Sequence, residues 1–331
     1  MKKIFSIVFS LLMVVQASAA DIKMMSYNIK GHGMTDARVA DIVTVINNAN
    51  PDVVAVQEVD NRTVLLQRHN YLKDIADGTS MHYSFHALVG TYYGIGLLSK
   101  EEPIAVTTHT FTRGTNSSDK ENRGIIIAEF PKYIFISTHY SLNADDRDTA
   151  TAWIIDYARQ QTKAVFVAGD FNAQPTYRAM VTFKNNGFKI INDTDIYTYP
   201  ADDPTSCIDM VICYNRYVDA MKFTCIESGI AEVASLTLSD VSDHLPVYVV
   251  IRPEDSSVES VSADNISITR NGDHLEISGL VTDANAMVFS ATGSLVKTAN
   301  SQSINIEGLP NGVYFVSLSN DTINKTIKVI I

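Results

Sequence analysis

The sequence predicts a layered α/β domain over residues 21–252, a linker at residues 253–262, and a small all-β domain at residues 263–331. In the first part, short apolar runs rich in β-branched residues alternate with segments whose apolar residues recur at helical spacing. About 230 residues of this kind are long enough to bury one sizeable core. In the last part, short alternating segments separated by glycine and proline are typical of a β-sandwich.

The first twenty residues have the pattern of a secretory signal peptide. Lys2 and Lys3 give a basic start, residues 4–15 form an apolar core, and residues 17–20 are small enough for cleavage. No later segment has the roughly 18 uninterrupted apolar residues of a membrane span. We therefore expect a mature protein that works outside the cytoplasm, secreted or at the cell surface, with the periplasm as the alternative.

Within the first domain, the helices and strands can be placed from their periods. Helices are predicted at residues 37–48, 145–161 and 177–185, the last followed by Gly187. Buried strands are predicted at residues 52–57, 133–138, 164–168 and 247–251, because these runs are short and continuously apolar. Periodicity does not tell parallel from antiparallel pairing.

Polar side chains end several of these apolar runs. If the ends meet at one edge of a sheet, they form a pocket of oxygen ligands and two imidazoles, which suits a divalent cation and a phosphate. The residues are Asn28, Glu58, His139, Asp170 with Asn172, Asp209, and Asp243 with His244.

In two of these groups, the residue types themselves indicate a chemical role. Period-two alternation after Gly169 is expected to send Asp170 and Asn172 to the same side; the alternative is an ordinary Asx turn. His244 can accept a proton from water, provided that a carboxylate such as Asp209 fixes its tautomer. The alternative is a histidine that caps a turn.

The remaining positions have simpler alternatives. Glu58 is either a metal ligand or a solvated strand end, and His139 either contacts a phosphate oxygen or faces water. The three cysteines are too few for a disulfide-stabilised fold and match no zinc pattern. Pairing of Cys213 with Cys225 stays open.

The charge balance bears on the substrate. The chain has a formal net charge of −11, whereas proteins that follow a nucleic-acid backbone usually present a basic surface. The balance weakens a nuclease interpretation without excluding it, because a metal site also gathers acidic residues.

Taken in order, the motifs SYNIKG, VVAVQEV, YGIGLLSK, RGIIIAEF, ISTHY, VAGDFN, IDMVI and SDHLPV resemble the endonuclease/exonuclease/phosphatase superfamily, which includes pancreatic deoxyribonuclease, bacterial sphingomyelinases and inositol polyphosphate 5-phosphatases. The resemblance covers residues 22 to about 252. It implies a four-layer α/β sandwich (deoxyribonuclease I-like), with two mainly antiparallel sheets face to face and helices outside.

The resemblance also implies roles. It makes the chain a phosphoric ester hydrolase that uses Mg²⁺, with Mn²⁺ as the alternative, and attacks phosphorus in line with a water activated by the metal and by histidine. The implied metal ligands are Glu58, Asn28 and Asp243, and the implied catalytic residues are His244, Asp209, Asp170, Asn172 and His139. Phosphate contacts are implied for Arg123, His139 and Asn172.

The chain departs from the family pattern at the rim of the site. Cys207 stands where many members have a basic residue, and Met210 replaces the usual tyrosine. No insertion is long enough to wrap a duplex or enter a membrane, which favours a compact, generalist phosphoesterase. The acidic charge favours small molecules or lipid headgroups over duplex DNA as the phosphate esters. A nuclease is the first alternative, with a basic stripe as its signature; a non-catalytic surface binding protein is the second. The stripe would use Lys30, Arg62, Arg113, Lys120 and Arg123.

The last 70 or so residues have a resemblance of their own. The segment LPNGVY and the ending KVII resemble the C-terminal sorting domain of the type IX secretion system of Bacteroidetes. This implies a secretion apparatus as a partner; the alternative is a generic β-sandwich module.

Overall fold

The computed structural model describes residues 20–62, 69–216, 220–254, 266–279, 284–300, 302–320 and 324–331. The predicted signal peptide, apart from Ala20, and most of the predicted linker lie outside these residues. The chain divides into two compact units between Glu254 and Asp255, and each is described by itself. Among the described helices, none is long and apolar enough to cross a membrane.

The first unit contains a six-stranded sheet in the order β11-β12-β1-β2-β4-β3. β1 and β2 run parallel, and the other neighbours run antiparallel. The register of β1 and β2 places Asn28 beside Gln57 at one end of the sheet. The strands are β1 (Ile22–Asn28), β2 (Val53–Asp60), β3 (His82–Val89), β4 (Tyr93–Ser99), β11 (Phe223–Ile230) and β12 (Val247–Pro253).

A second six-stranded sheet has the order β5-β6-β7-β8-β10-β9, with β7 and β8 parallel and the other pairs antiparallel. Its register aligns His139, Asp170 and Asp209 side by side across β7, β8 and β10. The strands are β5 (Ala105–Phe111), β6 (Arg123–Glu129), β7 (Tyr133–His139), β8 (Ala164–Asp170), β9 (Phe188–Ile190) and β10 (Asp209–Tyr214).

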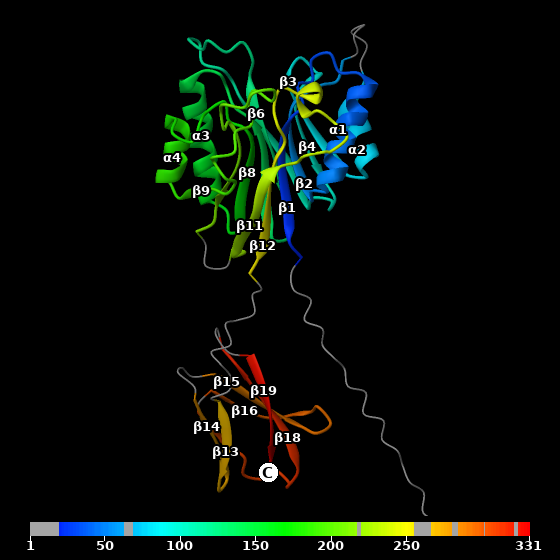
Figure 1. Cartoon of the computed structure of the whole chain (residues 1–331). Helices are drawn as coiled ribbons and strands as arrows, with labels where there is room; N and C mark the ends of the chain where they lie inside the picture. Colours follow the sequence, from blue (N-terminus) through cyan, green and yellow to red (C-terminus); the bar gives the residue numbers. More distant parts are fainter. Residues whose placement is uncertain are drawn as a thin grey trace, which may run out of the picture. The chain divides into compact units, whose positions relative to one another are not determined.

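Helices cover the outer faces of the two sheets. α1 and α2 lie on the first sheet, and α3 and α4 lie on the second (Figure 1). Capping fixes where they start: Thr35 accepts a hydrogen bond from the Arg38 amide, and Asn143 accepts from two amides at the start of α3. The helices are α1 (Asp36–Ala49), α2 (Tyr71–Thr79), α3 (Ala144–Arg159), α4 (Arg178–Asn185) and α5 (Leu238–Val241).

Three apolar layers hold this unit together. One lies between the first sheet and α1 and α2, and another between the second sheet and α3 and α4. The third lies between the sheets and includes Met24, Ala55, Phe135 and Phe166. The predicted four-layer α/β sandwich is therefore confirmed, with two mixed sheets in its middle layers.

The layer between the sheets changes from apolar to polar along the strands. In β8, Phe166 and Ala168 face the opposite sheet and the next residue of that row is Asp170; in β7, Phe135 is followed by Ser137 and then His139. β1 ends its inward row with Asn28. Strand alternation thus places the polar residues at one end of a shared interior.

The second unit consists of two small antiparallel sheets, in the orders β13-β14-β17 and β16-β15-β18-β19. Leu275, Val288 and Val316 belong to its buried core, so the predicted all-β fold is confirmed. The strands are β13 (Ser267–Asn271), β14 (His274–Ser278), β15 (Asn285–Ser290), β16 (Leu295–Asn300), β17 (Ser303–Asn305), β18 (Val313–Ser319) and β19 (Asn324–Ile330).

Two details go beyond the sequence analysis. Sequence periodicity did not predict α2, which is short and carries Gly78 near its end. The pairing of Cys213 with Cys225, which the sequence left open, is absent: they lie on β10 and β11, which belong to different sheets, and all three cysteines are free.

The packing predicts a large stability effect at Phe166, whose fully buried ring meets Tyr133 and Phe223 edge-on or tilted. We expect Phe166→Ala to lower the free energy of unfolding by about 3–5 kcal/mol, through lost transfer energy and the cavity left behind. Urea unfolding followed by the fluorescence of Trp153, the only tryptophan, measures it. Ile104→Ala, at a side chain 63% exposed, is the control and should change stability by less than about 0.5 kcal/mol; equal effects would contradict the core assignment.

Candidate active site

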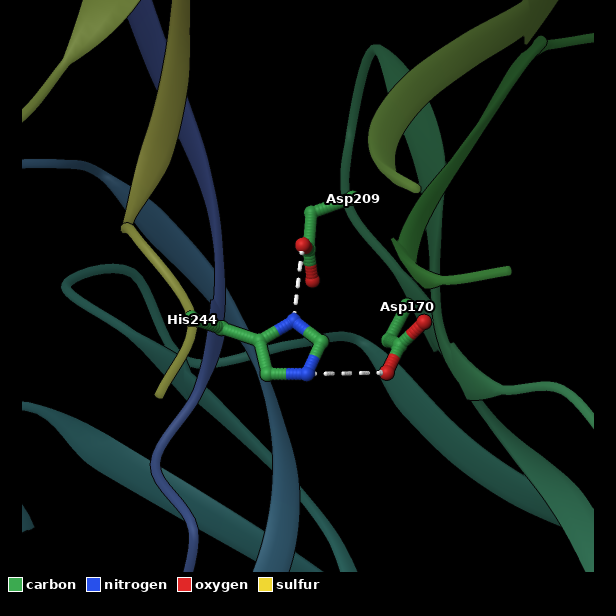
Figure 2. A group of neighbouring side chains, drawn as sticks. All are labelled: Asp170, Asp209 and His244. Carbon is green, nitrogen blue, oxygen red and sulfur yellow. Dashed lines mark hydrogen bonds and ion pairs between the residues drawn. The ribbon is translucent and has the colours of Figure 1, made fainter. Parts of the chain in front are cut away.

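His244 lies between two buried carboxylates (Figure 2). Its Nδ1 is 2.9 Å from Asp209 Oδ2, and its Nε2 is 3.7 Å from Asp170 Oδ2. The imidazole comes from the segment before β12 in the first sheet, whereas both carboxylates belong to the second sheet. The predicted pairing of His244 with Asp209 is present in the structure, and Asp170 adds a second carboxylate on the other ring nitrogen.

This arrangement shifts the pKa values of His244 and Asp170. Burial alone would lower the pKa of His244, but the neighbouring Asp209 and then Asp170 outweigh it and raise the pKa to about 10. Burial, and next the charge of Asp209, raise the pKa of Asp170 to about 7. The two carboxylates therefore favour the protonated imidazole, while burial and the neighbouring Asp209 favour the protonated form of Asp170.

Asp170 connects the site across the two sheets. Its Oδ2 accepts a hydrogen bond from Asn28 Nδ2 at 3.1 Å and lies 3.5 Å from His139 Nε2. Its Oδ1 accepts from the backbone amide of Asn172 at 2.8 Å. Because the side chain is 1% exposed, these contacts replace water as its partners.

Asn172 does not continue the strand alternation that was expected to place it on the same side as Asp170. β8 ends at Asp170, and Asn172 adopts a left-handed backbone with φ 44°. Its side-chain amide donates to the carbonyl of Tyr140 at 2.9 Å. The bond from its backbone amide to the Asp170 carboxylate is the Asx turn that the sequence offered as the alternative.

Glu58 lies in a bulge of β2 rather than at a strand end. The register with β4 shifts between Val56 and Val59, and Glu58 has a φ of 57°. Asn28 Nδ2 donates to Glu58 Oε1 at 3.1 Å, so one amide holds both Glu58 and Asp170. Gly31 makes room for this bulge, because a Cβ there would lie 1.9 Å from the Glu58 carbonyl oxygen.

Asp243 lies in the segment before β12, which is hydrogen-bonded to the end of β1 at Asn28. Ser242 Oγ donates to the Asn28 carbonyl at 2.6 Å, and Lys30 Nζ is 3.4 Å from Asp243 Oδ2. Asp243 Oδ1 is buried without a hydrogen-bond partner among the described residues. Such an orphaned carboxylate oxygen is costly unless a cation or water supplies the missing contact.

Two groups of residues are candidates for holding a cation. Ligand atoms of Asp170, Asp209 and His244 lie within 4.8 Å of one another. In that group, however, each ring nitrogen already faces a carboxylate, so a cation on either nitrogen would compete with one of these contacts. Glu58, Asn28 and Asp243 combine two carboxylates and an amide, groups that suit a divalent cation, with an unpartnered Asp243 oxygen, but the Asn28 Oδ1 already accepts a hydrogen bond from the Lys30 amide at 3.0 Å.

Arg123 lies beyond His139 and is held from several sides. Its Nε donates to Asp119 Oδ2 at 3.0 Å, while its Nη1 lies 3.1 Å from His139 Nδ1 and 3.3 Å from Glu121 Oε2. Burial, and next the Arg123 charge, hold the pKa of His139 well below its usual value. His139 is therefore a neutral ring between Arg123 and Asp170.

Several residues at the site escaped the sequence analysis. Asp119 is buried and accepts hydrogen bonds from Arg123, Ser141 and the Leu142 amide. The ring of Tyr199 lies 4.6 Å from that of His244. Both lie in loops that do not adjoin an apolar run, so the sequence gives no signal for them. They are identified only because the fold places them beside Arg123 and His244.

Comparisons with known proteins agree with this architecture. A model of the endonuclease/exonuclease/phosphatase family matches residues 25–244, and a model of a secretion system C-terminal sorting domain matches residues 262–331. A search of curated proteins found no match.

Solved structures share the fold at low sequence identity. A protein of the same family from Beutenbergia cavernae is 15% identical with a TM-score of 0.57, covering 94% of this chain and all of that one. One from Bacteroides vulgatus is 18% identical with a TM-score of 0.55, covering 71% and all of that chain. D. rerio TDP2, complexed with a single-strand DNA product, is 15% identical with a TM-score of 0.54, covering 70% and 99%.

The contact between His244 and Asp209 generates a first prediction for this site. Asp209→Asn keeps the shape but removes the negative charge that fixes the tautomer and favours the protonated ring. We expect a loss of about 100-fold in any turnover that the site supports, with unchanged unfolding midpoint within a few degrees. If the turnover of Asp209→Asn stayed within twofold of the wild-type value, the assigned role of Asp209 would be contradicted.

A second prediction concerns the close approach at Gly31. Gly31→Ala should displace the β2 bulge and with it Glu58, because the clash is with backbone and cannot be relieved by a rotamer. We expect at least a tenfold weaker affinity for Mn²⁺, measured by titration calorimetry on the folded protein. Gly229→Ala is the matched control, since its Cβ would have its nearest contact at 3.4 Å; equal affinities of the two variants would argue against Glu58 as a ligand.

Proposed function

This chain belongs to the endonuclease/exonuclease/phosphatase family, and we propose that it is a secreted, divalent-metal-dependent phosphoesterase that hydrolyses phosphate esters, diesters above all. The observation that carries the proposal is His244 held between Asp209 and Asp170 beside a neutral His139. Together these groups offer a proton acceptor, a charged donor and a neutral donor within one buried end of the sandwich.

The roles follow from the protonation states. His244, held protonated by its two carboxylates, donates from Nε2 to a phosphate oxygen. Asp170, whose pKa is raised by burial and by the charge of Asp209, is proposed to accept the proton of the attacking water. His244, the base that the sequence predicts, is the alternative acceptor. Asn172 keeps Asp170 oriented through its backbone amide and, with His139 and Arg123, is proposed to contact the phosphate.

Glu58, Asn28 and Asp243 are proposed to hold the metal, Mg²⁺ or Mn²⁺. When bound, the cation would neutralise the charge that develops on the phosphate and the leaving oxygen. The chain itself positions the groups: Asn28 donates to both Glu58 and Asp170 and so holds the proposed metal ligand and the proposed proton acceptor relative to one another.

The second candidate is a nuclease of the same family. The observation in its favour is the shared fold with D. rerio TDP2, a protein seen with a single-strand DNA product. Against it, most of the basic side chains expected to form a stripe have acidic or carbonyl partners. Lys30 pairs with Asp243, Arg62 with Asp60, Arg113 with the Asp119 carbonyl, and Arg123 with Asp119 and Glu121.

The sorting domain supports the location. The domain matched at residues 262–331 indicates secretion, and we propose that it engages a type IX secretion apparatus, leaving the hydrolase outside the cytoplasm. The predicted signal peptide would serve the first membrane crossing.

The test is hydrolysis of bis-p-nitrophenyl phosphate, p-nitrophenyl phosphate and plasmid DNA with Mg²⁺ or with EDTA. We expect metal-dependent cleavage of the diester and at least a 100-fold loss in Glu58→Ala, because the proposed ligand is gone. Glu101→Ala, at an exposed carboxylate, is the control and should retain full activity.

Each other outcome points elsewhere. Nicking of the plasmid at a comparable rate would favour the nuclease. Silence on all three substrates, with a folded protein, would contradict the proposal and favour a binding protein.

A further inference from the structure

Glu121 contacts the same Arg123 nitrogen, Nη1, as His139, whereas Asp119 contacts Nε. Glu121 Oε2 is 3.3 Å from Arg123 Nη1, and its side chain is 35% exposed, so it has one contact with the buried guanidinium and a path to solvent. Asp119 and Arg123 are 3% and 9% exposed by comparison. Glu121 is therefore the partner of Arg123 that an entering phosphate would meet first.

Arg123 does not need Glu121 to stay in place. Asp119 binds the guanidinium Nε and is itself fixed by the Ser141 hydroxyl and the Leu142 amide. The backbone amide of Glu121 also donates to Asp119 at 3.1 Å. Because this network holds both residues without the Glu121 carboxylate, that carboxylate is free to have another role.

The carboxylate changes the charge that a phosphate experiences. Two carboxylates, Asp119 and Glu121, surround the single charge of Arg123, and His139 is neutral. Across the whole site, carboxylates outnumber basic groups so strongly that a divalent cation would not reverse the balance. The carboxylates are Glu58, Asp119, Glu121, Asp170, Asp209 and Asp243, and the basic groups are Lys30, Arg123 and His244.

We propose that Glu121 makes the site selective for phosphodiesters over phosphomonoesters, by opposing the second negative charge of a monoester next to Arg123. This inference rests on the proposed phosphoesterase function. A diester carries one negative charge, whereas a monoester carries nearly two above its second pKa of about 6. A carboxylate at this position repels the monoester more, and like-charge repulsion of this kind is a common source of specificity.

The experiment compares kcat/KM for bis-p-nitrophenyl phosphate and p-nitrophenyl phosphate at pH 8 in wild type and Glu121→Gln. The amide keeps the shape of the side chain and removes its charge. We expect the ratio of diester to monoester activity to fall about threefold, because monoester hydrolysis rises more than diester hydrolysis. Glu121→Asp, which retains the charge, should stay nearer the wild-type ratio, and Glu101→Gln, which changes the net charge elsewhere, should equal it.

Binding supplies a readout that does not need turnover. Titrations followed by ³¹P NMR give the affinities for inorganic phosphate, mainly a dianion at pH 8, and for dimethyl phosphate, a monoanion. Glu121→Gln should improve the affinity for the dianion about tenfold and that for the monoanion only about threefold, because the repulsion is proportional to the charge of the ligand.

The outcomes separate this inference from the proposed function. Active wild type with an unchanged ratio in Glu121→Gln, or equal losses on both substrates, overturns the selectivity role and leaves the hydrolase standing. Inactive wild type overturns the hydrolase, and the two affinities then decide whether Glu121 discriminates between the anions.

Discussion

Two contacts join the sheets at their polar end, and the site depends on them. Asn28 of the first sheet donates to Asp170 of the second, and His244 of the first contacts Asp209 of the second. Neither sheet alone brings together a proton acceptor, an imidazole and a cation site. The chemistry is therefore coupled to folding: it exists only where the apolar layer between the sheets has brought the strand ends into register.

This coupling carries an energetic cost. Asp170, Asp209 and His244 are nearly inaccessible to water, and burying charged groups is unfavourable unless they are paired and hydrogen bonded. Here the imidazole compensates two carboxylates, while the apolar residues of the same strands supply the stabilisation. Oxygens of Asp209 and Asp243 remain buried without a hydrogen-bond partner among the described residues. The buried charges and unpartnered oxygens of this site therefore lower the stability of the fold.

The sequence predicted most of the residues that the structure brings together at this end of the sandwich, because strands are recognisable by their apolar runs and these residues follow or precede such runs. His139 and Asp170 end β7 and β8 as expected, but Asp209 begins β10: that strand runs antiparallel to β8, so its first residue lies at the same edge. Pairing direction is a long-range property that periodicity does not contain.

What sequence reasoning missed depends on contacts between distant loops. Asp119 and Glu121 belong to the site because they contact Arg123, and Arg123 reaches the site only because the pairing of β6 with β7 places it against His139. The geometry of Asn172 likewise depends on a local left-handed turn that alternation does not foresee. The acidic composition weakens a nuclease interpretation, and six of the 37 acidic residues lie at the candidate site itself.

The most direct test of the account is the fate of oxygen when the protein turns over bis-p-nitrophenyl phosphate in ¹⁸O water with Mg²⁺. Attack of water on phosphorus in this site predicts one ¹⁸O in the p-nitrophenyl phosphate product, none in the p-nitrophenol, and loss of turnover in His244→Ala. Label in the p-nitrophenol, or unchanged turnover in His244→Ala, would contradict it.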